Sequence, residues 1–153
     1  MKWVFCAVIC WIVLLLVVDY KRLKVLIFSG LLALISQLLV DGFAIDEDFY
    51  VINDPAIPIF GSSMFFSIGI VFPMGILVAQ TTTRGRKWQT LNVIAWVFLF
   101  TLFEVLAVNF EMMVHVDWTY SLSVVINVMV MVLITWFTEH FLMPRMELER
   151  GKH

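Results

Sequence analysis

The chain has 153 residues, a length that usually forms one domain. Hydrophobic residues make up 62% of it and charged residues 14%, whereas a soluble domain holds about 45–50% and about 25%. With a mean hydropathy of +0.98, a body of 17.7 kDa cannot bury so much apolar surface. The composition therefore predicts an integral membrane protein, and it excludes soluble enzymes, nucleic-acid-binding proteins and disordered regulators.

Five apolar runs are predicted to be membrane-spanning helices, because about 20 apolar residues cross roughly 30 Å of hydrocarbon. The predicted spans are residues 3–18, 25–40, 60–80, 88–110 and 118–138. Their connections are short, and no linker or internal repeat separates them. We therefore expect one all-α domain, residues 1–153, in which a polytopic bundle of five transmembrane helices is embedded in the lipid bilayer.

Lysine and arginine are confined to alternate connections. Three segments hold three bases each: Lys21, Arg22 and Lys24; Arg84, Arg86 and Lys87; and Arg145, Arg150 and Lys152. The intervening connections, residues 41–58 and 111–117, hold acids but no base. Only Lys2 departs from the pattern, so nine of the ten bases fall on one side. Because positively charged connections stay in the cytoplasm, the amino terminus is expected outside and the carboxyl terminus inside.

Small and aromatic residues predict how the helices are placed. Pro73 lies within the third predicted span, where a proline removes one backbone hydrogen bond and favours a kink. With Gly61, Gly69 and Gly75 nearby, this span is expected to be a close-packed central helix. Trp118, at the start of the fifth span, is expected in the outer interfacial belt of aromatic residues.

Acidic and imidazole side chains follow the fourth predicted span. Glu104, Glu111 and His115 are seven and four residues apart, a spacing that places them within about 40° of one another on a helix. Glu104 is expected in the outer third of the bilayer, whereas Glu111, His115 and Asp117 lie at or beyond the outer interface. Such a line of groups could bind a divalent metal, relay protons or attract cations. An intramembrane carboxylate is a functional hypothesis by default, because a charge there costs at least about 2.5 kcal/mol.

Structural roles are open for the same residues. Glu104 could be protonated, or hydrogen-bonded to another span, and only hold the bundle together. Its polar neighbours would be Ser36, Ser123 and Asn127. Glu111, His115 and Asp117 could form a solvated loop, and the pair Glu111 and His115 lacks the context of a known zinc motif. Asn127 could make a packing hydrogen bond or share a polar lining with Glu104. The sequence contains no cofactor-binding motif, so no cofactor is expected.

The second connection, residues 41–58, is predicted to be an acidic outer loop. Its acids are Asp41, Asp46, Glu47, Asp48 and Asp54. The apolar residues between them suggest a loop that rests on the interface or folds over the bundle. The charge could concentrate cations at the outer face, or it could be a by-product of the positive-inside topology.

Three features of the second half of the chain suggest a family. Gln80 at the end of the third span, Glu104 within the fourth, and the stretch His115-Val-Asp-Trp-Thr-Tyr-Ser121 resemble an uncharacterised family of small multi-span membrane proteins from Gram-positive bacteria. That family has a glutamate in the penultimate span and an aromatic-x-x-Trp pattern before the last, where this chain has His115 in place of the aromatic residue. The resemblance implies a multi-pass protein of the bacterial inner (plasma) membrane and no transferable activity.

Three functions are compatible with the sequence. The first is an accessory, assembly or interaction role in a membrane complex, with a membrane-protein partner or by self-association, which the small size and short loops favour. The second is an oligomeric cation or proton channel or transporter that uses Glu104. The third is a membrane-embedded enzyme acting on a lipid or isoprenoid, with Glu104, Glu111, His115 and Asp117 as acid/base or metal-binding groups. Since no phosphate loop, nucleophile elbow or zinc array is present, the sequence does not favour an enzyme.

Overall fold

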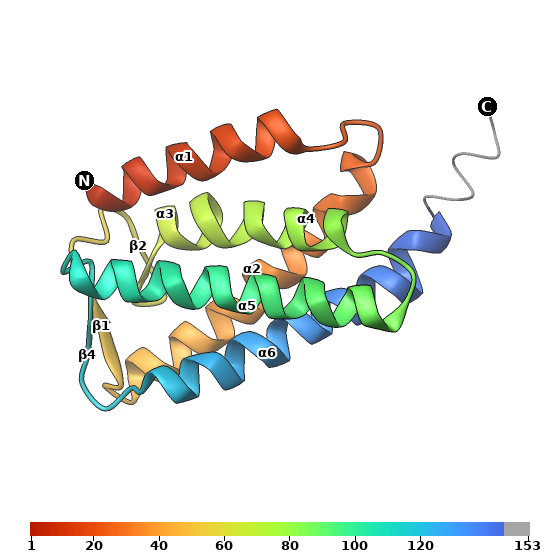
Figure 1. Cartoon of the computed structure of the whole chain (residues 1–153). Coiled ribbons are helices and arrows are strands. Elements are labelled where there is room, and N and C mark those ends of the chain that lie inside the picture. The colour runs from red at the N-terminus through yellow and green to blue at the C-terminus, as the bar shows by residue number, and fades with distance from the viewer. Residues whose placement is uncertain (146–153) are drawn as a thin grey trace.

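The computed structural model describes residues 1–145 (Figure 1). Its long helices are α1 (Lys2–Val17), α2 (Leu23–Asp46), α5 (Arg86–Asn109) and α6 (Tyr120–Phe137). A fifth helical segment consists of α3 (Met64–Phe66), the π-helical turn η1 (Ser67–Val71) and α4 (Phe72–Thr81), and a second π-helical turn, η2 (Thr138–Leu142), extends α6. The strands of this part of the chain are β1 (Tyr50–Ile52), β2 (Pro58–Ile59), β3 (Ser62–Ser63) and β4 (Met113–His115). The predicted basic tail, with Arg150 and Lys152, lies outside the described residues.

The predicted all-helical class is confirmed, and four segments of the described chain are long and apolar enough to cross a membrane. These are Leu23–Asp46, Met64–Thr81, Arg86–Asn109 and Tyr120–Arg145. They correspond to the second to fifth predicted spans. The first predicted span forms α1, which has 16 residues and is therefore about 24 Å long, shorter than the roughly 30 Å hydrocarbon core.

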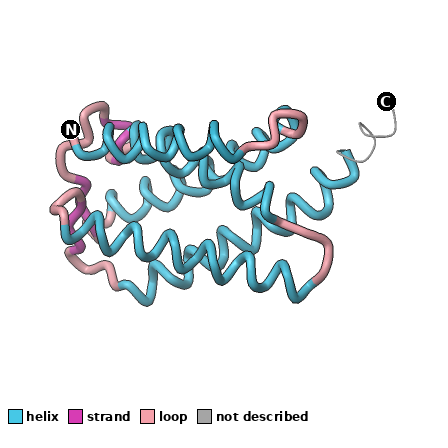
Figure 2. The backbone as a smooth tube through the Cα atoms, turned by 45° about the horizontal axis from the view of Figure 1, so that its top comes forward, coloured by secondary structure: helices cyan, strands magenta, loops and turns pink. Residues whose placement is uncertain are grey.

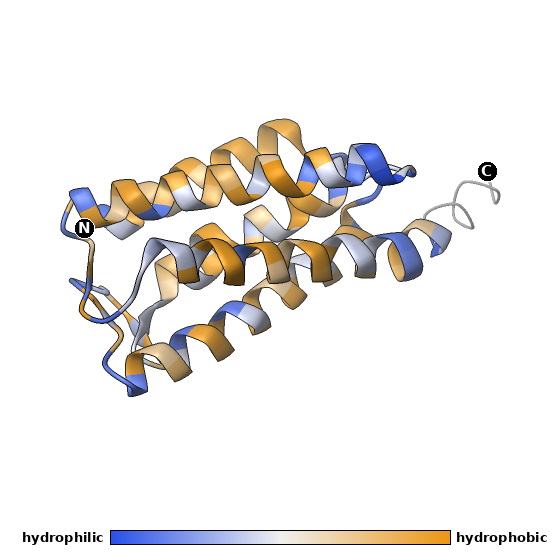
Figure 3. Ribbon diagram, turned by 60° about the horizontal axis from the view of Figure 1, so that its bottom comes forward, coloured by the Kyte–Doolittle hydropathy of each residue, from blue (hydrophilic) through white to orange (hydrophobic). Residues whose placement is uncertain are grey.

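The helical segments run back and forth along one axis (Figures 1 and 2). One end, which we call the strand end, holds the strands and the amino terminus. The other, which we call the basic end, holds the segments with Lys21, Arg22 and Lys24 and with Arg84, Arg86 and Lys87. Hydrophobic residues dominate the helices between the two ends (Figure 3). Lys2 lies at the strand end, where its Nζ donates a hydrogen bond of 2.6 Å to the Phe110 carbonyl just after α5, a position that the negative end of a helix favours.

The segment Met64–Thr81 forms the centre of the bundle, as predicted. In this segment 61% of the apolar window is buried, against 22–33% in the other three long segments. Small residues allow the close packing. A Cβ atom on Gly75 would lie 2.5 Å from the Ala33 Cβ and 2.9 Å from the Ser29 carbonyl oxygen of α2, and one on Gly69 would overlap the Ala7 Cβ of α1. Helix backbones come this close only where no side chain separates them.

Pro73 is accommodated by the π-helical turn η1 that precedes it. The Phe72 N–H donates to the Ser67 carbonyl, five residues back, instead of to the residue four back. Pro73 has no N–H, so an α-helical hydrogen bond is missing at this point in any case. The widened turn absorbs this defect, and the helical segment continues to Thr81.

Helices α2 and α5 end in the same way at the strand end. Asp48 and Glu111 each follow the last turn with a positive φ, 56° and 54°. In both cases the N–H of the next residue donates to the carbonyl five residues earlier. This arrangement is a Schellman motif, which stops a helix and redirects the chain. The chain then forms β1 after α2 and β4 after α5.

Two sequence predictions are wrong at this end. Asp41 does not begin an outer loop: it lies within α2 and is fully buried, because it continues the buried face of that helix, which includes Ser29 and Ala33. Trp118 is not an interfacial residue at the start of a helix. Helix α6 begins only at Tyr120, and the Trp118 ring is buried beneath it.

The antiparallel pair β1–β4 brings two distant polar residues to one face. Tyr50 lies opposite His115, Val51 opposite Val114, and Ile52 opposite Met113. The Val51–Val114 pair is exposed, whereas the other two pairs turn toward the bundle. Since side chains alternate between the faces of a strand, this register directs both Tyr50 and His115 inward.

Candidate functional site

Glu104 is buried at the strand end of α5, with 8% of its surface exposed. The His115 Nε2 atom lies 3.1 Å from Glu104 Oε1, although the ring N–H does not point along a hydrogen bond. The prediction that Glu104, Glu111 and His115 share one helical face is wrong, because α5 ends at Asn109. His115 reaches Glu104 from β4, after the chain has reversed.

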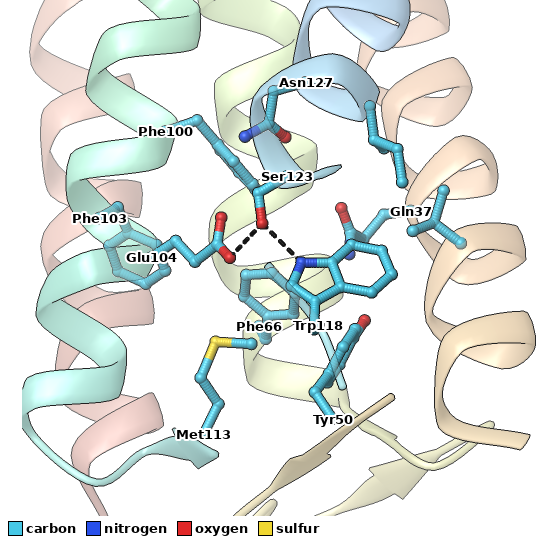
Figure 4. Close-up of a pocket in the computed structure, with 12 residues that line it drawn as sticks. Gln37, Tyr50, Phe66, Phe100, Phe103, Glu104, Met113, Trp118, Ser123 and Asn127 are labelled. Carbon is cyan, nitrogen blue, oxygen red and sulfur yellow. Dashed lines mark hydrogen bonds between the residues drawn. The ribbon is translucent and has the colours of Figure 1, made fainter. Parts of the chain in front are cut away.

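A directed chain of hydrogen bonds ends on Glu104. The Trp118 indole Nε1–H donates to Ser123 Oγ at 2.5 Å, and an indole nitrogen can only donate. The Ser123 hydroxyl in turn donates to Glu104 Oε1, and Figure 4 marks both hydrogen bonds. Of the partners considered from the sequence, Ser123 is thus the one found, whereas Ser36 bonds to the Leu32 carbonyl of its own helix.

A second buried carboxyl group, Asp41, lies on the neighbouring helix. Its Oδ1 atom accepts hydrogen bonds from the Tyr50 hydroxyl and from Gln37 Nε2, the latter at 2.5 Å. Its Oδ2 atom is buried without a partner in the described chain. The sequence analysis did not identify Asp41 as a buried residue of the candidate site. Gln37 and Asp41 are four residues apart, a spacing that places both on one face of a helix and could have indicated their contact.

A small cavity of about 50 Å³ lies between α2, α3, α5 and α6, beside Glu104. Its polar lining comes from Gln37, Tyr50, Glu104, Ser123 and Asn127 (Figure 4). Its apolar lining is Val40, Phe66, Phe100, Phe103, Met113, Trp118 and Ile126. Because one water needs roughly 10–15 Å³, the cavity has room for a few water molecules or a small ion.

A smaller cavity of about 20 Å³ continues toward the basic end. It shares Gln37, Phe100, Ile126 and Asn127 with the first cavity. Its other lining residues are apolar: Ala33, Val71, Met74, Gly75, Val130, Met131 and Ile134. The polar lining of the two cavities is therefore concentrated in the half of the bundle near the strand end.

The site is short of positive charge. No Lys or Arg of the described chain forms an ion pair with Glu104 or Asp41; His115 is the nearest basic group. Burial lowers the pKa of His115, so the imidazole is mostly neutral near pH 7. Burial also raises the pKa of the Tyr50 phenol, and the Asp41 and Glu104 carboxyls raise it further, so Tyr50 keeps the proton that it donates to Asp41.

The other predicted site residues are less involved. Glu111 and Asp117 are exposed. Asn127 is buried and lines both cavities, with a long hydrogen bond of 3.4 Å from its Nδ2 atom to Thr101 Oγ1. Within residues 1–145, no three His, Cys, Asp or Glu side chains gather closely enough to hold a metal ion. Glu111 and His115 diverge, since Glu111 occupies the exposed turn after α5 and His115 faces the bundle.

The lowered pKa of His115 predicts that the protein is less stable in acid. The unfolded chain takes up a proton near pH 6.5, whereas burial delays protonation of the folded state to a lower pH. The contribution of His115 should therefore be constant above pH 6.5 and should lower the stability as the pH drops below it. Unfolding in detergent micelles at pH 5 to 8 measures this. His115→Gln should flatten the dependence of the unfolding free energy on pH below pH 6.5. The control, His140→Gln at an exposed histidine, should leave this dependence as it is in wild type. An equal pH dependence in wild type and His115→Gln would contradict the prediction.

No protein-family model, curated protein or solved structure matches this chain. The resemblance to a family from Gram-positive bacteria therefore stays a prediction. Function is therefore inferred from the buried carboxyl groups of Glu104 and Asp41 and from the cavity beside Glu104.

Proposed function

We propose that the chain is a cell-membrane protein that crosses the bilayer five times, with the amino terminus outside and the carboxyl terminus in the cytoplasm. The collection of bases at the basic end supports this orientation. The short helix α1 packs along the central segment through Ala7 and Gly69, and a short span can be accommodated by local thinning of the bilayer.

We further propose that the protein is a carrier for a proton or another small cation, which binds at Glu104 from the strand end. The observation behind this proposal is a buried carboxyl group beside a cavity with room for a few water molecules, with no Lys or Arg of residues 1–145 paired to it. A buried carboxylate without a counter-charge is costly, so a site of this kind favours an added proton or cation.

The closed half of the interior favours a carrier over an open pore. Met74, Met131 and Ile134 line the second cavity, which is the smaller of the two. An ion that moved from Glu104 into this cavity would exchange polar ligands for a mostly apolar lining. Release to the cytoplasm would thus require a rearrangement of the helices around the central segment.

The other predicted functions have less support. The cavity is far smaller than the roughly 300–1,000 Å³ of pockets for organic ligands, so a lipid or isoprenoid would not fit inside it. An assembly role is compatible with a wholly apolar groove of about 350 Å³ between α1 and α3–η1, which includes Ala7, Trp11 and Phe65. The groove would face lipid or a partner helix equally well.

The carrier proposal is tested by ion uptake into liposomes that contain the purified full chain. Under an inward pH or cation gradient, wild-type protein should admit the ion and Glu104→Gln should reduce uptake to the level of empty liposomes. The matched control is Glu111→Gln, which makes the same change at an exposed acid near the same end of α5 and should keep wild-type uptake.

Uptake that is equal in wild type and Glu104→Gln would contradict the proposal, as would wild-type uptake no greater than that of empty liposomes. If wild-type uptake does not exceed that of empty liposomes, the assembly role becomes the favoured function. That role predicts a second protein in the native mass spectrum of the complex released gently from its membrane. An unchanged melting temperature of Glu104→Gln would show that lost uptake is not lost folding.

A further inference from the structure

Three oxygen atoms in the Glu104 cavity have no donor from residues 1–145. Glu104 uses Oε1 for Ser123 and presents Oε2 to the cavity (Figure 4). Gln37 and Asn127 donate through their amide nitrogens, to Asp41 and Thr101, so each keeps its amide oxygen as an acceptor. The remaining hydroxyls are occupied, since Ser123 bonds to Glu104 and Tyr50 bonds to Asp41.

Aromatic rings form most of the wall around these acceptors. Phe66, Phe100 and Phe103 contact one another, with ring centroids 6.3–6.4 Å apart. On the other side, Tyr50 and Trp118 meet edge to face at 5.2 Å. Figure 4 shows the Glu104 carboxyl group among these phenylalanine side chains, with Trp118 joined to it through Ser123. Aromatic rings attract desolvated cations, above all organic ammonium groups.

We propose that this cavity binds a small primary ammonium ion, with methylammonium as its simplest organic member. The three N–H groups of such an ion match the three free acceptors, Glu104 Oε2, Gln37 Oε1 and Asn127 Oδ1. Its positive charge compensates Glu104, and its methyl group packs against the phenylalanine rings. This inference rests on the proposed carrier function and names its substrate class.

The same lining is poorly suited to a metal cation. A hard metal ion that sheds its water takes about six or more oxygen ligands, whereas the described residues offer three free oxygens among aromatic rings. A proton would satisfy Glu104, but it would use neither the two amide oxygens nor the aromatic wall. An ammonium ion uses all three features of the cavity.

The test is calorimetric titration of the purified full chain in detergent micelles, at constant ionic strength, with the chlorides of methylammonium, tetramethylammonium and sodium. Methylammonium should bind at least about tenfold more tightly than the other two, since sodium gains less from the rings and tetramethylammonium has no N–H to donate. Gln37→Leu and Asn127→Leu should each weaken methylammonium by about tenfold through one lost charged hydrogen bond.

Phe103→Leu should weaken methylammonium binding by up to about tenfold, because it removes a ring and keeps the apolar volume. The control is Phe141→Leu, which removes a ring from the stacked Phe137–Phe141 pair, outside the cavity lining; it should bind as wild type does. If Gln37→Leu or Asn127→Leu does not fold, the affinity of Phe103→Leu for methylammonium still tests the ammonium inference.

Equal binding of sodium or tetramethylammonium, or wild-type affinity in Phe103→Leu, would overturn the ammonium inference. If the ammonium inference fails in this way but liposomes still take up protons or sodium in a Glu104-dependent manner, the carrier proposal stands and only the substrate class is wrong. If Glu104→Gln changes neither uptake nor methylammonium binding, both proposals fail.

Discussion

Gly75→Ala should destabilise the protein by about 3 kcal/mol, the upper range for an overpacked core. The added methyl group would lie 2.5 Å from the Ala33 Cβ and 2.9 Å from the Ser29 carbonyl oxygen, so α2 and α4 would have to separate. Separation would also stretch the 3.0 Å hydrogen bond from Ser29 Oγ to the Gly75 carbonyl. Unfolding by SDS in mixed micelles measures the change in free energy.

The matched control for Gly75→Ala is Gly42→Ala, whose added Cβ would meet no atom within 4 Å. Gly42 lies in the interior of α2, so alanine there should stabilise the helix by up to about 1 kcal/mol. The two substitutions are chemically identical and are expected to change stability in opposite directions. A loss of stability at both positions, or at neither, would show that close packing of α2 and α4 is not what distinguishes them.

Gly69→Ala tests the second close contact and offers a rescue. Its added Cβ would overlap the Ala7 Cβ and would lie 3.2 Å from the Ala7 Cα, so the double variant Gly69→Ala, Ala7→Gly removes the overlap and should recover most of the lost stability. The corresponding rescue of Gly75→Ala by Ala33→Gly should fail, because the Ser29 backbone oxygen remains 2.9 Å away. A side chain can be deleted, whereas a backbone atom cannot, and the double-mutant cycle separates the two cases.

Tyr50→Phe should destabilise the protein by about 1–3 kcal/mol, because it removes a hydrogen-bond donor from a buried carboxyl group. Asp41 is fully buried and would lose one of the two hydrogen bonds that its Oδ1 atom accepts, keeping the one from Gln37. The control is Tyr120→Phe, which removes a hydroxyl group from a tyrosine that is 43% exposed. Thermal unfolding of the two variants should differ by several degrees, with Tyr120→Phe close to wild type.

The double variant Asp41→Leu, Tyr50→Phe refines the prediction for Tyr50. Once the carboxyl group is absent, loss of the tyrosine hydroxyl should cost little, because both partners of a buried hydrogen bond have then become apolar. The double variant should thus lose less stability than the sum of the single variants. Additive losses would mean that the Tyr50–Asp41 hydrogen bond contributes little to folding.

The amino-acid sequence by itself predicted the all-helical class of the protein and the approximate positions of its helices. Hydropathy is a property of contiguous residues, so runs of about 20 apolar residues predict membrane-length helices without knowledge of tertiary contacts. Gly69, Gly75 and Pro73 likewise predicted a central third helix, since small residues are informative wherever helices pack closely. Glu104 could be singled out from its apolar surroundings alone.

Only the tertiary structure decided which groups surround Glu104. Asp48 and Glu111 end their helices in the left-handed conformation that usually belongs to glycine, so the sequence contained no clear stop signal at either place. The reversals after these residues pair β1 with β4, and the register of that pair turns Tyr50 toward Asp41 and His115 toward Glu104. These contacts join residues far apart in the chain, and helical periodicity describes only neighbours within one helix. The helices could therefore be predicted from local pattern, whereas the polar cavity exists only because distant segments meet at the strand end.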